Sequence, residues 1–261
     1  MLDIFCSVPI LLAMVIETNP APASNQAKPQ RHVVVRRTWL SEKPDASGFL
    51  SAALMIFLMA IVSGLYWSNF RNAAELFPAI PRKLFTLVPG ENPEWWRLFS
   101  SLFSHSDLAH FLSNSLSILM FGSFLFAFFG PVRVFVTAIL FGALTNWLTL
   151  KYLPPDAKLL GASGIAFWIG GAWLVLYLLI DTKRSWFQRF LRSVGVGLLL
   201  FMPSQAFDPS ISYRAHFIGF FLGLLWGFFH YWSNARKFKA AEVLEVIEEG
   251  DDFLPHLETS P

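Results

Sequence analysis

The sequence predicts an all-α protein that crosses a membrane several times. Hydrophobic residues make up 54% of the chain and charged residues only 15%, whereas soluble domains carry about 25% charged residues. The apolar runs are continuous and about 20 residues long, which is the length of a membrane-spanning α-helix. Strands of a membrane β-barrel would alternate apolar and polar residues instead. We therefore expect a polytopic bundle of helices.

Six segments are expected to span the membrane. They cover residues 49–67, 108–129, 132–152, 162–180, 193–202 and 213–232. The fifth is short and could begin as early as residue 187. Pro131 follows a tight turn at Gly130 and suits the first turn of the third helix. The six spans are predicted to pack as one membrane-embedded core over residues 49–233.

A long loop, residues 68–107, joins the first two spans. It is rich in aromatic residues and interrupted by prolines, whereas a solvent loop would be more polar. We expect this loop to be embedded in the membrane surface, as amphipathic segments are.

Two polar segments flank the expected core. Residues 1–48 form an N-terminal arm, whose apolar start at residues 4–16 is too short for a membrane span and lacks the basic beginning of a secretion signal. Residues 234–261 form an acidic tail. We expect both segments to be solvated and without a fixed structure.

The distribution of charge predicts the orientation. Six spans put both termini on one side of the membrane, and about twice as many lysines and arginines fall on that side as on the other, so the positive-inside rule predicts cytoplasmic termini. We expect a bacterial inner membrane, because the six compact spans follow no cleavable presequence.

The composition also argues against several classes of function. A net charge of +2 with no basic stripe gives no sign of nucleic-acid binding. The single cysteine, Cys6, excludes a disulfide within the chain and a zinc site built on cysteines. The sequence predicts neither a metal nor a cofactor, and it does not indicate an oligomeric state.

Four polar side chains inside the expected spans are candidates for function, because polar groups in hydrocarbon are costly. They are His110 and Asn114 in the second span, Ser163 in the fourth and His216 in the sixth. His110 and Asn114 are four residues apart and share one helix face. Each of the four lies in the outer half of an inward-running helix. One such residue could simply join helices by a hydrogen bond, but four at matched depth favour a reaction site.

Small residues predict a close approach of the fourth and sixth spans. One face of the sixth span holds His216, Gly219, Gly223 and Gly227, and one face of the fourth holds Ser163, Phe167, Gly170 and Gly171. Small residues let two helices pack backbone to backbone. We expect these faces to meet and to bring His216 within hydrogen-bond reach of Ser163.

This arrangement predicts nucleophilic catalysis. A serine is a weak nucleophile until a base takes its proton, and His216 is placed to be the base for Ser163. The six spans contain no Asp or Glu, so no carboxylate can orient the imidazole from within the spans. Phe167, one turn after Ser163, could hold the ring by stacking.

Donors for an oxyanion are expected on both sides of the nucleophile. His110 and Asn114 can donate from their side chains, and the backbone N–H groups of Ser163 and Ala162 are free at the start of a helix. Two glycines shape this region. Gly161 is expected to let the loop turn into the helix, and Gly164 to keep the wall beside Ser163 thin.

Together these residues resemble the rhomboid family of intramembrane serine proteases. The resemblance covers about residues 49–233. The matching pieces, in the family's order, are Trp96-Arg97, His105, His110 with Asn114, the G-x-S-G-x-x-F of 161–167 and the A-H-x-x-G-x-x-x-G of 215–223.

The resemblance implies a six-helix core that cuts membrane-spanning segments of other proteins near their outer end, after a small residue. Ser163 would be the nucleophile, His216 the general base and acid, and His110 and Asn114 the oxyanion donors. Trp96-Arg97 would belong to the membrane-embedded first loop. The fifth span and residues 203–212 would form the substrate gate and cap. The implied partners are transmembrane substrates and the lipid bilayer.

Two departures from the family pattern and two alternative functions remain. The N-terminal arm matches no feature of the family. Many members of the family carry an acidic residue near the inner end of the second core helix, where this chain has Phe126. A catalytically silent relative that binds membrane-protein clients is the main alternative, although the intact pair of Ser163 and His216 argues against it. A small transporter is a third hypothesis, but the chain has no intramembrane carboxylate and no inverted repeat.

Overall fold

We describe the protein from a computed structural model, in which residues 31–68, 82–89, 94–155, 157–201 and 212–248 are described. The chain divides into a large unit, Val33–Glu245, and a small one, Met1–His32 with Val246–Pro261. The large unit holds the helices considered below. Cys6 and the apolar start at residues 4–16 lie outside the described residues, as do most of the expected cap and part of the first loop.

Four of the expected spans are helices that are long and apolar enough to cross a membrane. They are α1 (Ala46–Ser68), the continuous segment Leu108–Phe129, α5 (Pro131–Leu150) and α6 (Ser163–Ile180). The other two expected spans are helical as well, as α7 (Trp186–Phe201) and α8 (Tyr213–Ala240). Length and apolarity alone do not mark these two as spans, because α7 is short and α8 includes histidines and a polar end. The predicted helical membrane fold is confirmed.

The second span is not a uniform α-helix. It consists of α3 (Leu108–Ser117), a π-helical turn η4 (Ile118–Gly122) and α4 (Ser123–Phe129). Single π-helical turns inside α-helices often occur at functional sites. Here the turn begins four residues after Asn114.

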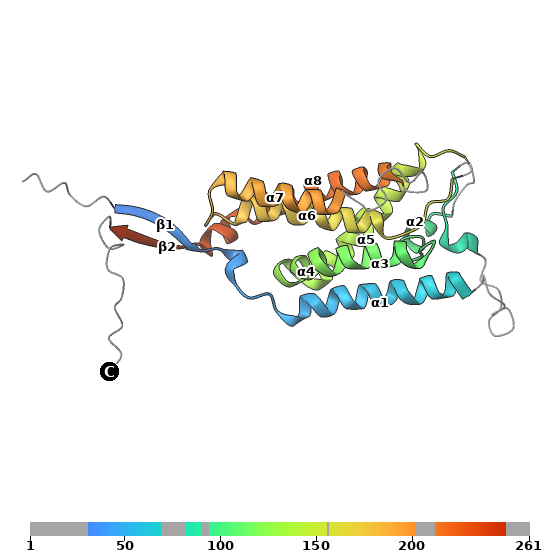
Figure 1. Ribbon diagram of the computed structural model, residues 1–261, viewed down its shortest axis with the longest axis horizontal. Helices are drawn as coiled ribbons and strands as arrows, with labels where there is room; N and C mark the ends of the chain where they lie inside the picture. Colours follow the sequence, from blue (N-terminus) through green and yellow to red (C-terminus); the bar gives the residue numbers. More distant parts are fainter. Residues whose placement is uncertain (1–30, 69–81, 90–93, 156, 202–211, 249–261) are drawn as a thin grey trace, which may run out of the picture. The chain divides into compact units, whose positions relative to one another are not determined.

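Helix α6 is the centre of the bundle. In its apolar stretch 56% of the residues are buried, compared with 28% in α1. It packs against α8, α7 and α5 and against the second span. Figure 1 shows α7 and α8 along one side of α6, with α3 and α4 between α6 and α1. Ser163 is therefore the first residue of the most buried of the four apolar helices.

Helices α6 and α8 touch backbone to backbone. A Cβ atom added to Gly219 would lie 2.5 Å from the carbonyl oxygen of Gly164, and one added to Gly223 would lie 2.2 Å from that of Trp168. One added to Gly227 would lie 2.9 Å from the carbonyl oxygen of Ala172. The glycine face expected on the sixth span therefore meets the fourth span through carbonyls of α6, and no larger residue fits between them.

The terminal segments differ from the expected solvated coil. Strand β1 (Arg31–Arg37) pairs with β2 (Val243–Glu248) in a two-stranded sheet, so the described chain is not purely α-helical. Runs of β-branched residues favour both strands, and Arg36 forms an ion pair with Glu245.

The segment before α1 also has a fixed place. It contains a short helical turn, η1 (Trp39–Ser41). The indole Nε1–H of Trp39 donates to the carbonyl of Phe128 at 3.2 Å, and the ring meets that of Phe238 edge-on at 5.8 Å. This packing, together with the start of α1 at Ala46 and the end of α8 at Ala240, carries ordered structure beyond the expected limits of 49–233.

The described part of the first loop is tied to the bundle. It includes the short turns η3 (Arg82–Phe85) and α2 (Arg97–Ser100). Leu87 and Leu159 exchange two backbone hydrogen bonds of 2.9 and 2.8 Å. The side-chain amide of Asn146 on α5 donates to the carbonyl of Leu98 at 3.0 Å. The first loop thereby lies against the segment that leads to Ser163.

Candidate active site

Ser163 is the first residue of α6, and Gly161 sets its position. Gly161 has a φ of +114°, a conformation that other residues rarely adopt. Its N–H donates to the carbonyl of Ser101 at 2.8 Å. A Cβ atom at Gly161 would lie 2.6 Å from Cε1 of His110. The glycine thus lets the chain turn and lets the His110 ring approach the backbone two residues before Ser163.

His216 reaches the same face of α6 from α8. Its imidazole stacks on the ring of Phe167, with centroids 4.2 Å apart and planes 11° from parallel. Ser163 and Phe167 are four residues apart and so lie on one face of α6. Among the described residues, no hydrogen bond joins Ser163 to His216. Catalytic hydrogen bonds are often long without substrate and tighten when it binds.

His110, in the first turn of α3, lines the candidate site on the side of that helix. Asp107 caps this helix, since its carboxylate accepts the His110 backbone N–H at 2.8 Å. That hydrogen bond is the main reason why the pKa of Asp107 is lowered. Nδ1 of His110 lies 3.2 Å from the hydroxyl of Ser106. The other edge of the ring faces Gly161.

Asn114 lies one turn further along α3 and is almost fully buried, with 6% of its surface exposed. Its amide Nδ2 has no hydrogen-bond partner among the described residues. Burying an unsatisfied donor costs about 1–3 kcal/mol. A donor kept in this state is suited to an acceptor that arrives with a ligand.

His105, to which the sequence analysis assigned no role, joins α1 to the segment that leads into α6. It is fully buried. The backbone N–H of Ala162 donates to its Nε2 at 3.4 Å, and its Nδ1 lies 2.9 Å from the hydroxyl of Ser63. A backbone N–H can only donate, so Nε2 accepts and Nδ1 carries the proton. The neutral ring therefore links α1 to the residue before Ser163.

This link corrects one expectation. Ala162 was expected to offer a free backbone N–H to an oxyanion, but that N–H donates to His105. The backbone N–H of Ser163 is left as the candidate donor at the start of α6. The partners of His105 lie 42 and 57 residues away in the chain, so no local sequence pattern could have indicated this contact.

The burial of His105 predicts a loss of stability in acid. Burial, followed by the charge of His110, lowers the pKa of His105 from 6.5 to about 3. Above pH 6.5 the ring is neutral in both states, but below it only the unfolded chain takes up the proton. This histidine should therefore reduce the free energy of unfolding by about 1.4 kcal/mol per pH unit below pH 6.5. Thermal melting in detergent from pH 7.5 to 4 measures the effect.

The matched variant is His105→Gln, because an amide can accept from Ala162 and donate to Ser63 without titrating. Its melting temperature should fall less steeply with decreasing pH than that of the wild type. Equal slopes in the two proteins would show that His105 does not remain neutral in the fold.

Trp96 and Arg97 lie at the start of α2 in the first loop. Arg97 is buried, its Nε donates to Glu94 at 3.0 Å, and its guanidinium lies 5.7 Å from the centroid of the Trp96 ring.

Gly164 lies between two helices. Its carbonyl contacts Gly219 on α8, and a Cβ added to it would lie 3.0 Å from Cγ2 of Thr145 on α5. Within the part of the chain that the structure describes, no cluster of His, Cys, Asp and Glu is placed to hold a metal.

Comparison with known proteins identifies a family. A family model described as the Rhomboid domain matches residues 92–233, which include Ser163 and His216. YdcA of Bacillus subtilis (strain 168) is 30% identical over 152 residues, covering 56% of this chain and 73% of that protein. The rhomboid protease GlpG of Haemophilus influenzae is 26% identical over 151 residues, covering 56% and 74%. RHOMBOID-like protein 5 of Arabidopsis thaliana is 29% identical over 182 residues, covering 66% and 57%.

Proposed function

Because the chain belongs to the rhomboid family, we propose that it is an intramembrane serine endopeptidase that cleaves the membrane-spanning segments of other proteins. It is an integral multi-pass membrane protein, and its relatives include proteins named as rhomboid proteases. The observation that carries the proposal is the stacking of His216 on Phe167, one turn from Ser163.

In the proposed reaction Ser163 and His216 act as a dyad. His216 takes the proton of the Ser163 hydroxyl as Oγ attacks the carbonyl carbon of the scissile peptide. It then gives this proton to the leaving amine, and the C–N bond breaks to leave an acyl-enzyme. Water, deprotonated by His216, hydrolyses the ester and restores Ser163. The stack on Phe167 supports the proposal, because it holds the imidazole where a triad would use a carboxylate.

The negative charge on the tetrahedral intermediate would be stabilised from two helices. The backbone N–H of Ser163 points out of the start of α6, where the helix dipole favours negative charge. The side-chain donors from α3 would be the ring of His110, which faces Gly161, and Nδ2 of Asn114, which has no partner in the part of the chain that the structure describes. Donors that are already in place need no rearrangement during the reaction.

Asn114→Ala is therefore expected to lower turnover by roughly 10–1000-fold, the range for loss of one oxyanion donor. The fold should be retained, because Nδ2 of Asn114 has no hydrogen-bond partner to lose among the described residues. Cleavage of a transmembrane reporter and the melting temperature together measure these effects. Asn146→Ala is the contrasting variant, since the amide of Asn146 donates to Leu98 and to Ser101. It should melt earlier; an early melt of Asn114→Ala as well would make Asn114 a structural residue.

The test of the proposal is cleavage by the purified full chain in liposomes that contain a single-span reporter. Mass spectrometry of the fragments should locate one cut near the outer end of the reporter span, after a small residue. Binding of the reporter without any cleavage would favour the catalytically silent, client-binding alternative. Solute flux without cleavage would favour the transporter.

The proposed setting is a bacterial inner membrane, with cytoplasmic termini and a site that opens near the outer face. The excess of basic residues on the side of the termini supports this orientation.

A further inference from the structure

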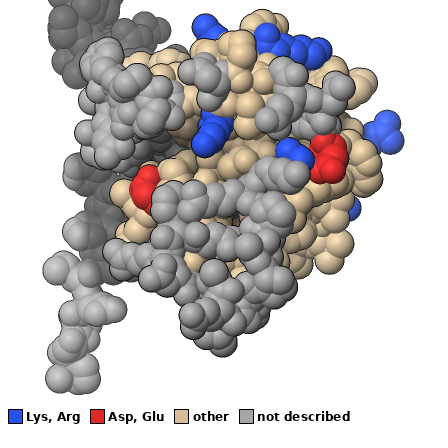
Figure 2. All heavy atoms as spheres, turned by 90° about the vertical axis from the view of Figure 1, so that its right-hand side faces the viewer, with Lys and Arg blue, Asp and Glu red and all other residues tan. Residues whose placement is uncertain are grey.

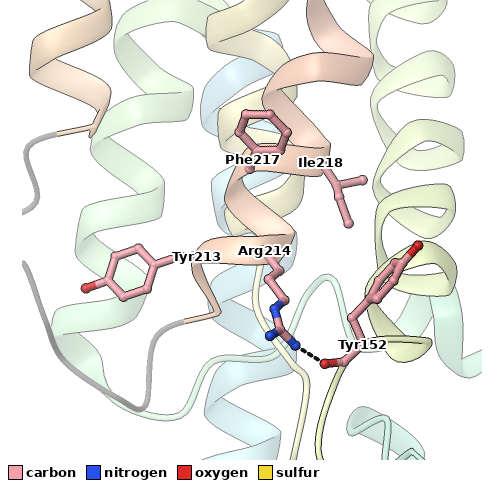
Figure 3. A pocket seen from close by; sticks show the side chains of 5 residues that line it. All are labelled: Tyr152, Tyr213, Arg214, Phe217 and Ile218. Carbon is pink, nitrogen blue, oxygen red and sulfur yellow. Dashed lines mark hydrogen bonds between the residues drawn. The ribbon is translucent and has the colours of Figure 1, made fainter.

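A groove lies beside the first turn of α8. It has a volume of about 480 Å³ and is lined by Tyr152, Tyr213, Arg214, Phe217 and Ile218. Figure 3 shows Arg214 reaching toward the chain at Tyr152, with Phe217 and Ile218 further along α8. The proposed reaction uses none of these five residues.

The groove looks away from the catalytic face of α8. Successive residues of a helix are turned by about 100°, so Arg214 and Ile218 share a face that lies roughly opposite to His216. His216 and Gly219 face α6 instead. Tyr213, at the edge of the groove, touches the His216 ring edge-on at 6.2 Å. A peptide bound at Ser163 would therefore not fill this groove.

The lining changes from polar to apolar along the helix axis. Arg214 lies in the first turn of α8, and its guanidinium donates to the backbone carbonyl of Tyr152, just after α5. Phe217 and Ile218 follow one turn deeper, and Phe217 is 67% exposed. In a membrane-spanning helix the first turn lies at the level of the lipid headgroups and the next turn lies in the hydrocarbon. The groove thus offers a cation at headgroup level and apolar surface below it.

The charge around the groove suits an anion. A guanidinium has five N–H donors, and the described hydrogen bonds of Arg214 use one of them. None of the described residues that line the groove is acidic. Figure 2 views this end of the helical unit and shows basic side chains over its upper part. The acidic residues described at this end, Glu94 and Asp107, are engaged with Arg97 and with the start of α3.

We propose that the groove binds one anionic phospholipid, with the phosphate on Arg214 and an acyl chain along Phe217 and Ile218. A cation at headgroup level with apolar side chains below it matches a phospholipid better than a peptide or a free anion. A lipid with a cationic amine in its headgroup would find no carboxylate among the described residues of the lining. The expected ligand is therefore an acidic lipid such as phosphatidylglycerol.

The proposal is tested by native mass spectrometry of the full chain in detergent, titrated with phosphatidylglycerol or phosphatidylcholine. The wild type should retain one phosphatidylglycerol with about fivefold preference, as expected for one cation at an anionic headgroup. Arg214→Gln should lose the preference, and Arg214→Lys should keep most of it. Lys158→Gln is the matched control, because it makes the same change of charge at the same end but outside the groove.

Several results would overturn the proposal. An equal loss in Arg214→Gln and Lys158→Gln would show that binding follows general surface charge. Displacement of the lipid by inorganic phosphate would show a plain anion site. Phe217→Ala should weaken the binding of both lipids. Unchanged binding would show that the acyl chain does not lie in the groove. Circular dichroism melts check that each variant is folded.

Discussion

Ser163→Ala and His216→Ala are each expected to abolish covalent labelling by a fluorophosphonate or isocoumarin probe. Such probes react with an activated serine hydroxyl and not with a resting one. Without Ser163 there is no nucleophile, and without His216 the proposed general base is lost. Cleavage of a transmembrane reporter should fall by at least about 10⁴-fold in either variant, as when one member of a catalytic unit is lost.

Two controls sharpen this prediction. Because the two residues act as a unit, the double variant should be no slower than the single ones. Ser115→Ala removes a buried serine on α3, whose hydroxyl has no partner among the described residues, and it should label like the wild type. Labelling of Ser163→Ala at the wild-type level would place the reactive serine elsewhere and refute the proposed dyad.

The helices were predictable because one property, a continuous apolar run, determines both their existence and their length. The second span was expected at residues 108–129 and is observed as Leu108–Phe129. The strands at the two ends of the chain were not predictable in the same way. Arg36 and Glu245 are 209 residues apart, and strand pairing over such a distance leaves no periodic signal in the sequence. The π-helical turn at Ile118–Gly122 likewise has no marker in composition.

In the candidate site, too, local features could be predicted from the sequence and contacts between distant residues could not. Pairs four residues apart, such as His110 with Asn114 and Ser163 with Phe167, can be placed on one face from spacing alone. The stack of His216 on Phe167 was anticipated because few other groups near the serine could hold an imidazole. Contacts between a side chain and a distant backbone could not be anticipated. The bond from Ala162 to His105 is of this kind, and it changes the set of donors available to an oxyanion.

Gly219→Val and Gly223→Val are expected to abolish cleavage and to destabilise the fold. At both positions an added Cβ would lie within 2.5 Å of a backbone carbonyl of α6, and a backbone atom cannot move aside as a flexible side chain can. Helix α8 must then separate from α6, which draws His216 away from Ser163. A misplacement of about 1 Å can cost 10²-fold in rate, and overpacking costs about 1–3 kcal/mol or more in stability. Reporter cleavage and thermal melting measure the two effects.

Glycines at different distances from His216 along α8 can distinguish an effect on catalysis from an effect on helix packing. Gly227→Val meets the carbonyl of Ala172 at 2.9 Å, two turns beyond Gly219 and further from His216, so it should cost stability but less activity than Gly219→Val. Gly64→Ala is the control, because an added Cβ there has nothing within 4 Å and alanine favours a helix by about 1 kcal/mol. If Gly219→Val cleaved at the wild-type rate, the contact between α6 and α8 would not be what positions His216. If Gly227→Val and Gly219→Val lost activity equally, the loss would reflect general unfolding and not the geometry of the dyad.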